Sequence, residues 1–116
     1  MIYSVVLKGE ALLKNPGRDK LKNLIDSKKN VVWLDLKDPR DEDYNFLKGL
    51  MRIHPLTIDD CRHSIEMPKI DRFEDYIFVV FHKVEYDAKE RKVEMLETDA
   101  ILGRNFIITE IGRAHV

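Results

Sequence analysis

The sequence has very little cysteine: among its 116 residues, only Cys61 carries a thiol. A single thiol cannot form an internal disulfide framework, and it cannot supply the several thiolates of a cysteine-rich zinc site. Scarce cysteine is typical of proteins from a reducing compartment. We therefore expect a protein of a reducing environment, without disulfide support.

Long apolar segments are missing as well. The longest uninterrupted apolar run is Tyr76–Phe81, whereas a membrane-spanning helix needs about 20 apolar residues. The first ten residues, MIYSVVLKGE, have neither the basic start nor the small-residue cleavage site of a signal peptide. We expect residues 1–116 to be soluble by themselves.

The chain has no excess of charge of either sign. Its 20 basic residues are matched by 21 acidic ones, so there is no electrostatic reason to propose nucleic acid or an anionic membrane surface as a partner. Apolar residues make up 44% of the chain, which is enough for a core and argues against disorder. The length suits one compact domain.

Motifs of the common enzyme classes are absent. There is neither a glycine-rich phosphate loop nor the Gly-x-Ser-x-Gly turn of serine hydrolases. Cys61 and His63 are close enough in the chain to suggest a thiolate and its base, but no third orienting group is evident, and a small buried thiol is the simpler interpretation. The four histidines form no His-x-x-x-His pair, which disfavours zinc. We expect no enzymatic activity.

What the sequence does contain is a succession of strand and helix patterns. Asp38-Pro39 predicts the start of the second helix, because aspartate can cap free amides and proline is tolerated at the first helical position. Apolar residues on both faces of 31–36 predict a strand inside the sheet, and residues 64–70 are expected to be irregular. The order predicts an α/β fold, a mixed β-sheet with helices packed on its faces. The predicted elements are strand 2–8, helix 18–29, strand 31–36, a helix from 38 to about 52, helix 55–62, and strands 72–86, 92–102 and 106–110.

Carboxylates near the third predicted helix are the best candidate ligands. Asp59 and Asp60 lie in that helix, and Glu66 follows shortly. Oxygen ligands of this type suit Mg²⁺, which keeps several waters and needs only one or two protein carboxylates. Neighbouring residues on a helix point about 100° apart, so this pair cannot hold one ion symmetrically. A solvated acidic helix face is the alternative.

Five short motifs along the chain resemble segments that occur together in one known protein family. Residues 54–60 (HPLTIDD) resemble a His-Pro-Leu-x-x-Glu-Asp segment, and residues 68–70 (PKI) are similar to the end of an Arg-Pro-Lys-Val element. Residues 75–80 (DYIFVV) resemble an Asn/Asp-Tyr-x-Phe strand, and residues 33–36 (WLDL) a Trp-Ile-Asp strand. Residues 102–109 (LGRNFIIT) are similar to a Leu-Gly-Lys-Asn-Phe-Val-Ile-Thr hairpin. Together and in their order along the chain, the five motifs resemble the N-terminal cytosolic domain of CorA-type magnesium/cobalt transporters.

The resemblance implies an α/β/α sandwich formed by residues 1–110, with residues 111–116 as a tail at the start of a stalk region or at a fragment end. It further implies a subunit of a homopentameric channel at the cytoplasmic face of the cell membrane. The stalk helix and the two membrane helices of such a channel would lie outside these residues.

The resemblance also implies a regulatory metal site. In the family, acidic residues between neighbouring cytosolic domains bind divalent cations and favour the closed state. The family's aspartate falls on Asp60, and Asp59 replaces the preceding glutamate. The implied ion is Mg²⁺, bound weakly by the isolated chain because the acidic partner lies on the stalk, with Co²⁺ and other divalent cations as alternatives. In residues 63–69 (HSIEMPK), the family's polar His-Gln-Arg cluster is lost.

Two other interpretations stay open at this point. A zinc-exporting branch of the superfamily shares the architecture, so the same domain could belong to an exporter. A stand-alone soluble binding module with the same fold is the third possibility, and a small molecule bound near His63 would favour it.

Overall fold

The computed structural model of the chain describes residues 1–65 and 67–114. The predicted mixed sheet with helices is confirmed. Within the described residues, no helix has the length and apolar character needed to cross a bilayer. In chain order the elements are β1 (Ile2–Lys8), β2 (Ala11–Lys14), α1 (Arg18–Asp26), β3 (Val31–Leu36), α2 (Asp41–Leu50), α3 (Pro55–Arg62), β4 (Lys69–Arg72), β5 (Tyr76–Asp87), β6 (Lys92–Gly103) and β7 (Phe106–Ala114).

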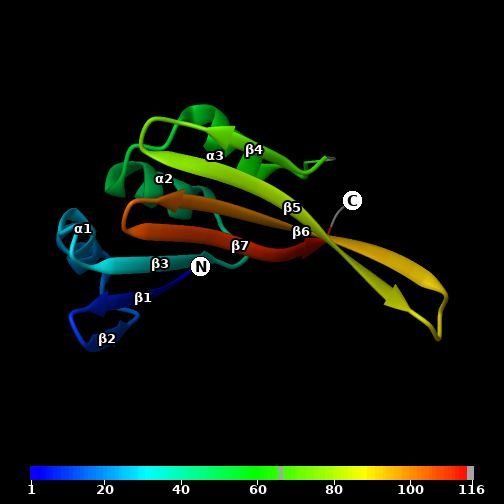
Figure 1. Cartoon of the computed structure of the whole chain (residues 1–116), viewed down its shortest axis with the longest axis horizontal. Helices are drawn as coiled ribbons and strands as arrows, with labels where there is room; N and C mark the ends of the chain where they lie inside the picture. Colours follow the sequence, from blue (N-terminus) through cyan, green and yellow to red (C-terminus); the bar gives the residue numbers. More distant parts are fainter. Residues whose placement is uncertain (66, 115–116) are drawn as a thin grey trace.

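All seven strands belong to one sheet, in the order β2-β1-β3-β7-β6-β5-β4 (Figure 1). The pair formed by β3 and β7 is parallel, and all other neighbours are antiparallel. The parallel pair lies in the middle because β3 is followed by two helices and a meander before the chain returns as β7. The strand predicted to lie inside the sheet, β3, does so.

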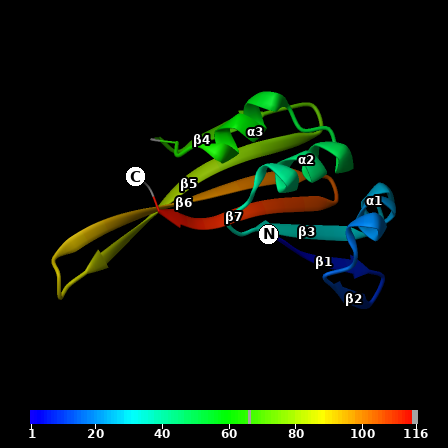
Figure 2. The same cartoon turned by 180° about the vertical axis from the view of Figure 1, so that it is seen from behind.

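The three helices lie on the same face of the sheet, which Figure 2 shows from the helix side. Every second strand residue points to this face and meets the apolar stripes of the helices. Phe78 in β5 and Leu34 in β3 are completely buried there. One cluster therefore joins all three helices to the sheet, and its buried helix members come from α1 (Leu21, Ile25), α2 (Tyr44, Leu47, Leu50) and α3 (Ile58, Cys61).

The opposite face of the sheet, which we call the bare face, is covered by none of the described helices (Figure 1). It is nevertheless apolar: Tyr3, Val31, Trp33 and Phe81 are exposed there. Trp33 alone leaves 43% of its surface accessible. The described residues thus form two layers, a sheet and one helical layer, and the second helical layer of the expected α/β/α sandwich is not among them.

β5 and β6, with 12 residues each, are the longest strands among the described residues. They pair along their whole length, from Tyr76 with Gly103 to Asp87 with Lys92, and the outer half projects beyond the other strands as a two-stranded arm (Figure 1). The arm gives the molecule its elongated outline of 48 × 29 × 23 Å.

Several elements differ from the sequence-based prediction. The first helix, predicted to reach residue 29, ends at Asp26. β2 was not predicted, and β4 falls in residues predicted to be irregular and at the start of a predicted strand. The second helix begins at Asp41 and not at Asp38, whose φ of 44° is incompatible with a helix start. β7 continues to Ala114, past the predicted end at residue 110. Residues 115–116 of the expected tail lie outside the described residues.

Candidate functional site

Helix α3 positions the two aspartates that the sequence singles out as metal ligands. His54 precedes the helix, and its Nδ1 accepts a hydrogen bond from the backbone N–H of Leu56 at 3.1 Å. Pro55 occupies the first helical position, where its missing N–H costs nothing. Thr57, Ile58 and Cys61 face the core. Residues 59 and 60 therefore lie on the side of the helix that is turned away from the core.

Asp60 turns toward β4 and forms an ion pair there. Its Oδ2 lies 2.6 Å from the Nζ of Lys69, and the same Nζ lies 2.8 Å from Oδ2 of Asp71. The hydrogen bond to Asp60, followed by the one to Asp71, raises the pKa of Lys69 above its ordinary value. Lys69 is thus held as a cation between two carboxylates at neutral pH. The side chain of Asp60 is 27% exposed, so solvent ions still reach it.

Asp59 lies in different surroundings. Its side chain is 66% exposed, and its Oδ1 is 3.7 Å from Nδ1 of His63 one turn further on. The same ring nitrogen lies 2.8 Å from the backbone oxygen of Asp59. The structure therefore does not bring Asp59 and Asp60 together around one point. This agrees with the prediction from the 100° spacing of neighbouring residues on a helix. Glu66, the third candidate carboxylate, lies outside the described residues.

No group of three or more histidine, cysteine, aspartate or glutamate side chains in the described part of the chain is arranged to hold a metal ion. Asp60 with Asp71 supplies two carboxylates, and Lys69 already fills the space between them. A divalent cation at this place would need to displace the ammonium group or to gain further oxygen ligands from outside the described residues.

The pairing of Cys61 with His63 has no geometric support. Cys61 is buried in the hydrophobic core, whereas the imidazole of His63 is 69% exposed and is turned toward Asp59. Cys61 instead serves as a small hydrophobe beneath α3.

Sequence reasoning missed a buried polar cluster at the base of the arm. Glu97, Asp99 and Glu110 are almost fully buried, and Asp99 lies directly opposite Glu110 in the sheet. Glu97 accepts a 2.6 Å hydrogen bond from the backbone N–H of Ile65, and the Nε2 of His82 donates to the backbone oxygen of Ile65 at 2.8 Å. In a sequence, buried strand positions are recognised by apolar residues at every second position. Acidic residues at these positions break that alternation, so the sequence gives no signal for the cluster.

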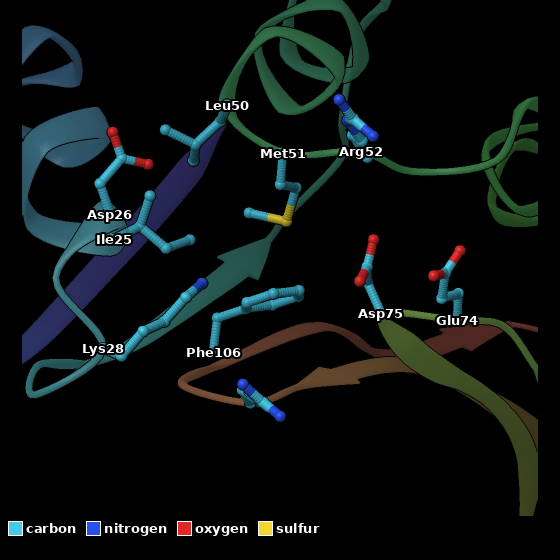
Figure 3. Close-up of a pocket in the computed structure, with 10 residues that line it drawn as sticks. Ile25, Asp26, Lys28, Leu50, Met51, Arg52, Glu74, Asp75 and Phe106 are labelled. Carbon is cyan, nitrogen blue, oxygen red and sulfur yellow. The ribbon is translucent and has the colours of Figure 1, made fainter.

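A hollow of about 520 Å³ lies where α1 and α2 end above the turn between β6 and β7 (Figure 3). Phe106 and Met51 form its apolar centre. Three basic and three acidic side chains surround them, and among the described residues none of these six forms an ion pair. Because the two signs balance, the hollow has no net preference for an anion or a cation. The charged side chains are Asp26, Lys28, Arg52, Glu74, Asp75 and Arg104.

Residues 28–110 match the family described as CorA-like Mg2+ transporter protein. The chain is 32% identical over 78 residues to the magnesium transporter ALR2 of Saccharomyces cerevisiae, covering 66% of this chain and 9% of that protein. It is 32% identical over 56 residues to the cobalt/magnesium transport protein CorA of Thermotoga maritima, covering 48% of this chain and 16% of that protein. The chain spans less than a quarter of the length of the curated relatives it matches.

Among solved structures, the fold is similar to the soluble domain of CorA from Methanocaldococcus jannaschii. The TM-score is 0.63 at 16% identity, and the match covers 97% of this chain and 41% of that chain. At this identity, the likeness concerns the fold alone. It includes almost all of the present chain, so the sheet and its single helical layer are part of the shared fold.

Proposed function

The chain belongs to the CorA-like Mg²⁺ transporter family, and on that premise we propose that it is the cytosolic regulatory domain of a CorA-type protein that transports Mg²⁺ or Co²⁺. In this proposal the full-length protein is a homopentamer at the cytoplasmic face of the cell membrane, anchored by helices outside residues 1–116. The observation that carries the proposal is the family match over residues 28–110. CorA-family transporters are not enzymes, which agrees with the absence of enzyme motifs.

The regulatory part of the proposal rests on Asp60. Its carboxylate is accessible and lies on α3, within the segment that resembles the family's sensor motif. Two carboxylates and one ammonium leave a net charge of −1 at the cluster of Asp60, Lys69 and Asp71, which attracts a divalent cation only weakly. A carboxylate from a neighbouring subunit would raise the negative charge and provide the missing oxygen ligand.

Such an arrangement would work as a switch. With Mg²⁺ bound between subunits, carboxylates that otherwise repel each other are held together, which favours the closed state. When the ion leaves, Lys69 remains paired with Asp60 and neutralises the carboxylate within its own subunit. The neighbouring subunits are then released from each other. The population shift depends on how much more tightly the ion binds the closed state.

Asp59 has a secondary role in this proposal. It lies on the same helix but points to solvent beside His63, so it can contact an ion or a neighbouring subunit only from another direction than Asp60. It contributes negative charge near the interface and does not chelate the same ion symmetrically.

The bare face supports the view that the chain works inside a larger assembly. Large apolar side chains, among them Tyr3, Trp33 and Phe81, are exposed on one continuous side of the sheet. Exposed apolar surface of this kind is typical of protein contacts and is uncommon on an independent monomer.

The test is made in the full-length protein, reconstituted into vesicles, by measuring Co²⁺ and Mg²⁺ flux against the Mg²⁺ concentration on the cytosolic side. Asp60→Asn is expected to raise the Mg²⁺ concentration needed to halve the flux by about tenfold, the effect of losing about 1.4 kcal/mol of ion binding. Lys69→Met, which removes the competing ammonium, is expected to lower it.

Asp41→Asn is the control, because it removes an equally charged carboxylate from an exposed position on α2. It should leave the Mg²⁺ dependence of closure unchanged. Unchanged Mg²⁺ inhibition in Asp60→Asn would refute the sensor assignment, while absence of Mg²⁺ and Co²⁺ flux in the wild type, with Zn²⁺ flux in its place, would favour the exporter interpretation.

A further inference from the structure

Charge is distributed unevenly along the chain. Residues 8–29 contain seven lysines and arginines but only three carboxylates, although the whole chain carries a net charge of −1. These residues run from the last residue of β1 through β2 and α1, and β2 and α1 lie at one end of the molecule (Figure 1). A positive field over one end of a nearly neutral protein favours anions at that end.

A hollow of about 590 Å³ lies at this end, between the β1–β2 hairpin and α1. Three lysines from three different elements line it: Lys8 from the end of β1, Lys14 from the end of β2, and Lys20 from the first turns of α1. Among the residues that the structure describes, no carboxylate lines it. Its volume lies within the range of about 300–1,000 Å³ that is usual for small-molecule sites.

The three ammonium groups have no counter-ion in the described part of the chain. Within the described residues, none of Lys8, Lys14 and Lys20 takes part in an ion pair. Other cations nearby are already engaged: Arg18 bonds to Asp43, and Lys22 donates to a backbone oxygen of α2. An anion placed among the three lysines that line the hollow would be attracted by all three ammonium groups.

The rest of the lining is apolar. Leu13 and Leu24 are half-buried and pack against the hydrophobic core from β2 and α1. Leu12, on the outermost strand of the sheet, is 57% exposed beside the lysines. Lys20 and Leu24 are four residues apart on α1, so the helix presents its cationic and apolar groups to the hollow from one side.

From this juxtaposition we propose that the hollow binds an amphiphilic anion, a phosphate monoester with a short hydrocarbon body. The phosphate would lie among the lysines, and the hydrocarbon would cover Leu12 and the half-buried leucines. The proposal does not depend on the transport function. The same chemistry is offered by a soluble alkyl phosphate and by an anionic lipid headgroup, so the test separates these two sources.

The test is an NMR titration of the full chain with hexyl phosphate and with inorganic phosphate. Hexyl phosphate is expected to bind at least tenfold more tightly, since burial of about two methylene groups suffices for that factor, and the shifted amide signals are expected to lie within residues 8–24. Leu12→Ser should weaken binding of hexyl phosphate but not of inorganic phosphate.

The lysines are tested with the double variant Lys14→Gln/Lys20→Gln, which should weaken binding of hexyl phosphate at least tenfold. The matched control is Lys28→Gln/Lys29→Gln, which removes the same charge from the other end of the α1 region, outside the hollow, and should change binding less than threefold. All four lysines are exposed, and circular dichroism verifies that the variants stay folded.

Vesicles of phosphatidylglycerol and of phosphatidylcholine identify the source. Sedimentation with the anionic vesicles only, abolished by Lys14→Gln/Lys20→Gln, would assign the hollow to a lipid headgroup, and no sedimentation would assign it to a soluble phosphate. The proposal is overturned if hexyl phosphate binds no more tightly than inorganic phosphate. It is also overturned if both double variants weaken binding equally, or if vesicles bind while hexyl phosphate does not.

Discussion

The buried carboxylate of Asp43 should make the stability of this domain depend on pH in a measurable way. Its side chain is only 3% exposed and lies in the first turn of α2. Oδ2 accepts hydrogen bonds from the backbone N–H of Arg40 at 3.0 Å and from the amino group of Met1 at 2.9 Å. Oδ1 accepts one from Arg18 at 2.6 Å. Three donors, two of them charged, therefore converge on one carboxylate.

These contacts lower the pKa of Asp43. Burial by itself would raise the pKa, but the hydrogen bond from Arg40 and those from Met1 and Arg18 outweigh burial and bring it from 3.8 to about 2. At about 1.4 kcal/mol per pKa unit, the difference corresponds to about 2 kcal/mol of folding stability. Because the folded-state pKa is the lower one, this stability is fully present above pH 4 and is lost as the pH falls toward 2.

The measurement is the free energy of unfolding by urea at pH 6 and at pH 2.5, for the wild type and for Asp43→Asn. At pH 6 the variant should be less stable by about 2 kcal/mol, and at pH 2.5 the gap should shrink to less than about 1 kcal/mol, because the wild-type carboxyl is then partly protonated. The difference in free energy between the wild type and Asp43→Asn at each pH cancels the acid sensitivity of all other carboxylates, because both proteins contain them.

Asp41→Asn provides the baseline, since it makes the same substitution in the same helical turn at a side chain that is 81% exposed. An exposed ion pair of this kind contributes less than about 1 kcal/mol. If the gap between the wild type and Asp43→Asn is equally large at both pH values, Asp43 does not titrate as its contacts imply, and the reasoning is refuted.

Two further predictions concern buried hydrogen bonds. Asn105→Ala should lower the free energy of unfolding by urea by about 1–3 kcal/mol, because Nδ2 of Asn105 donates to two backbone oxygens at the end of α1 at 2.9 and 3.2 Å. The control is Asn45→Ala, at an exposed position. Equal effects of the two substitutions would contradict the prediction. Tyr76→Phe should cost a similar amount, since its buried hydroxyl accepts a hydrogen bond from the start of α3 at 2.9 Å and shares another at 2.8 Å. Tyr86→Phe, on the exposed arm, should change stability by less than about 0.5 kcal/mol.

Much of the fold could be predicted because the signals are local. The bounds of β1, β3 and α3 agree with the prediction residue for residue. For β1 and β3, β-branched residues in a row favour an extended backbone through packing on the pleated surface. For α3, proline cannot continue the preceding helix but is well suited to the first position of a new one, so a single dipeptide sets both boundaries.

The two missed strands depend on contacts far away in the sequence. Ala11–Lys14 has no apolar alternation, and Lys69–Arg72 places a charged residue at three of its four positions. Each becomes a strand only by pairing with a long neighbour, β1 or β5. Short edge strands of this kind carry little side-chain signal, since their backbone hydrogen bonds supply the stability.

The predicted start of α2 was wrong for a related reason. Asp38-Pro39 is a reasonable local start signal, but Asp43 binds the backbone N–H of Arg40 and is itself held by Arg18 from another helix. This tertiary anchor fixes the first turn two residues later than the local signal suggests, and Asp38 is left in a turn with a positive φ.

The candidate site shows the same limit. Helical geometry correctly predicted that Asp59 and Asp60 point in different directions, because that depends only on the turn of the helix. The partner of Asp60 could not be predicted, since Lys69 reaches it from β4, one of the missed strands. A prediction that leaves residues 64–70 irregular therefore describes Asp60 as a solvated carboxylate, whereas the structure shows it in a charged cluster.

The bare face shows how the pattern in β3 should be interpreted. Apolar residues on both sides of this strand predicted an interior position, and β3 does lie between β1 and β7, yet Trp33 remains exposed. The polar groups around Trp33 are already satisfied: its Nε1–H donates to Thr109 at 2.9 Å, and the Thr109 hydroxyl donates to Asp35 at 2.7 Å. A surface that pairs its own donors and leaves apolar groups outward loses little when water is removed. β3 thus has the sequence of a strand buried on both sides, which supports the proposal that this domain functions within a larger assembly.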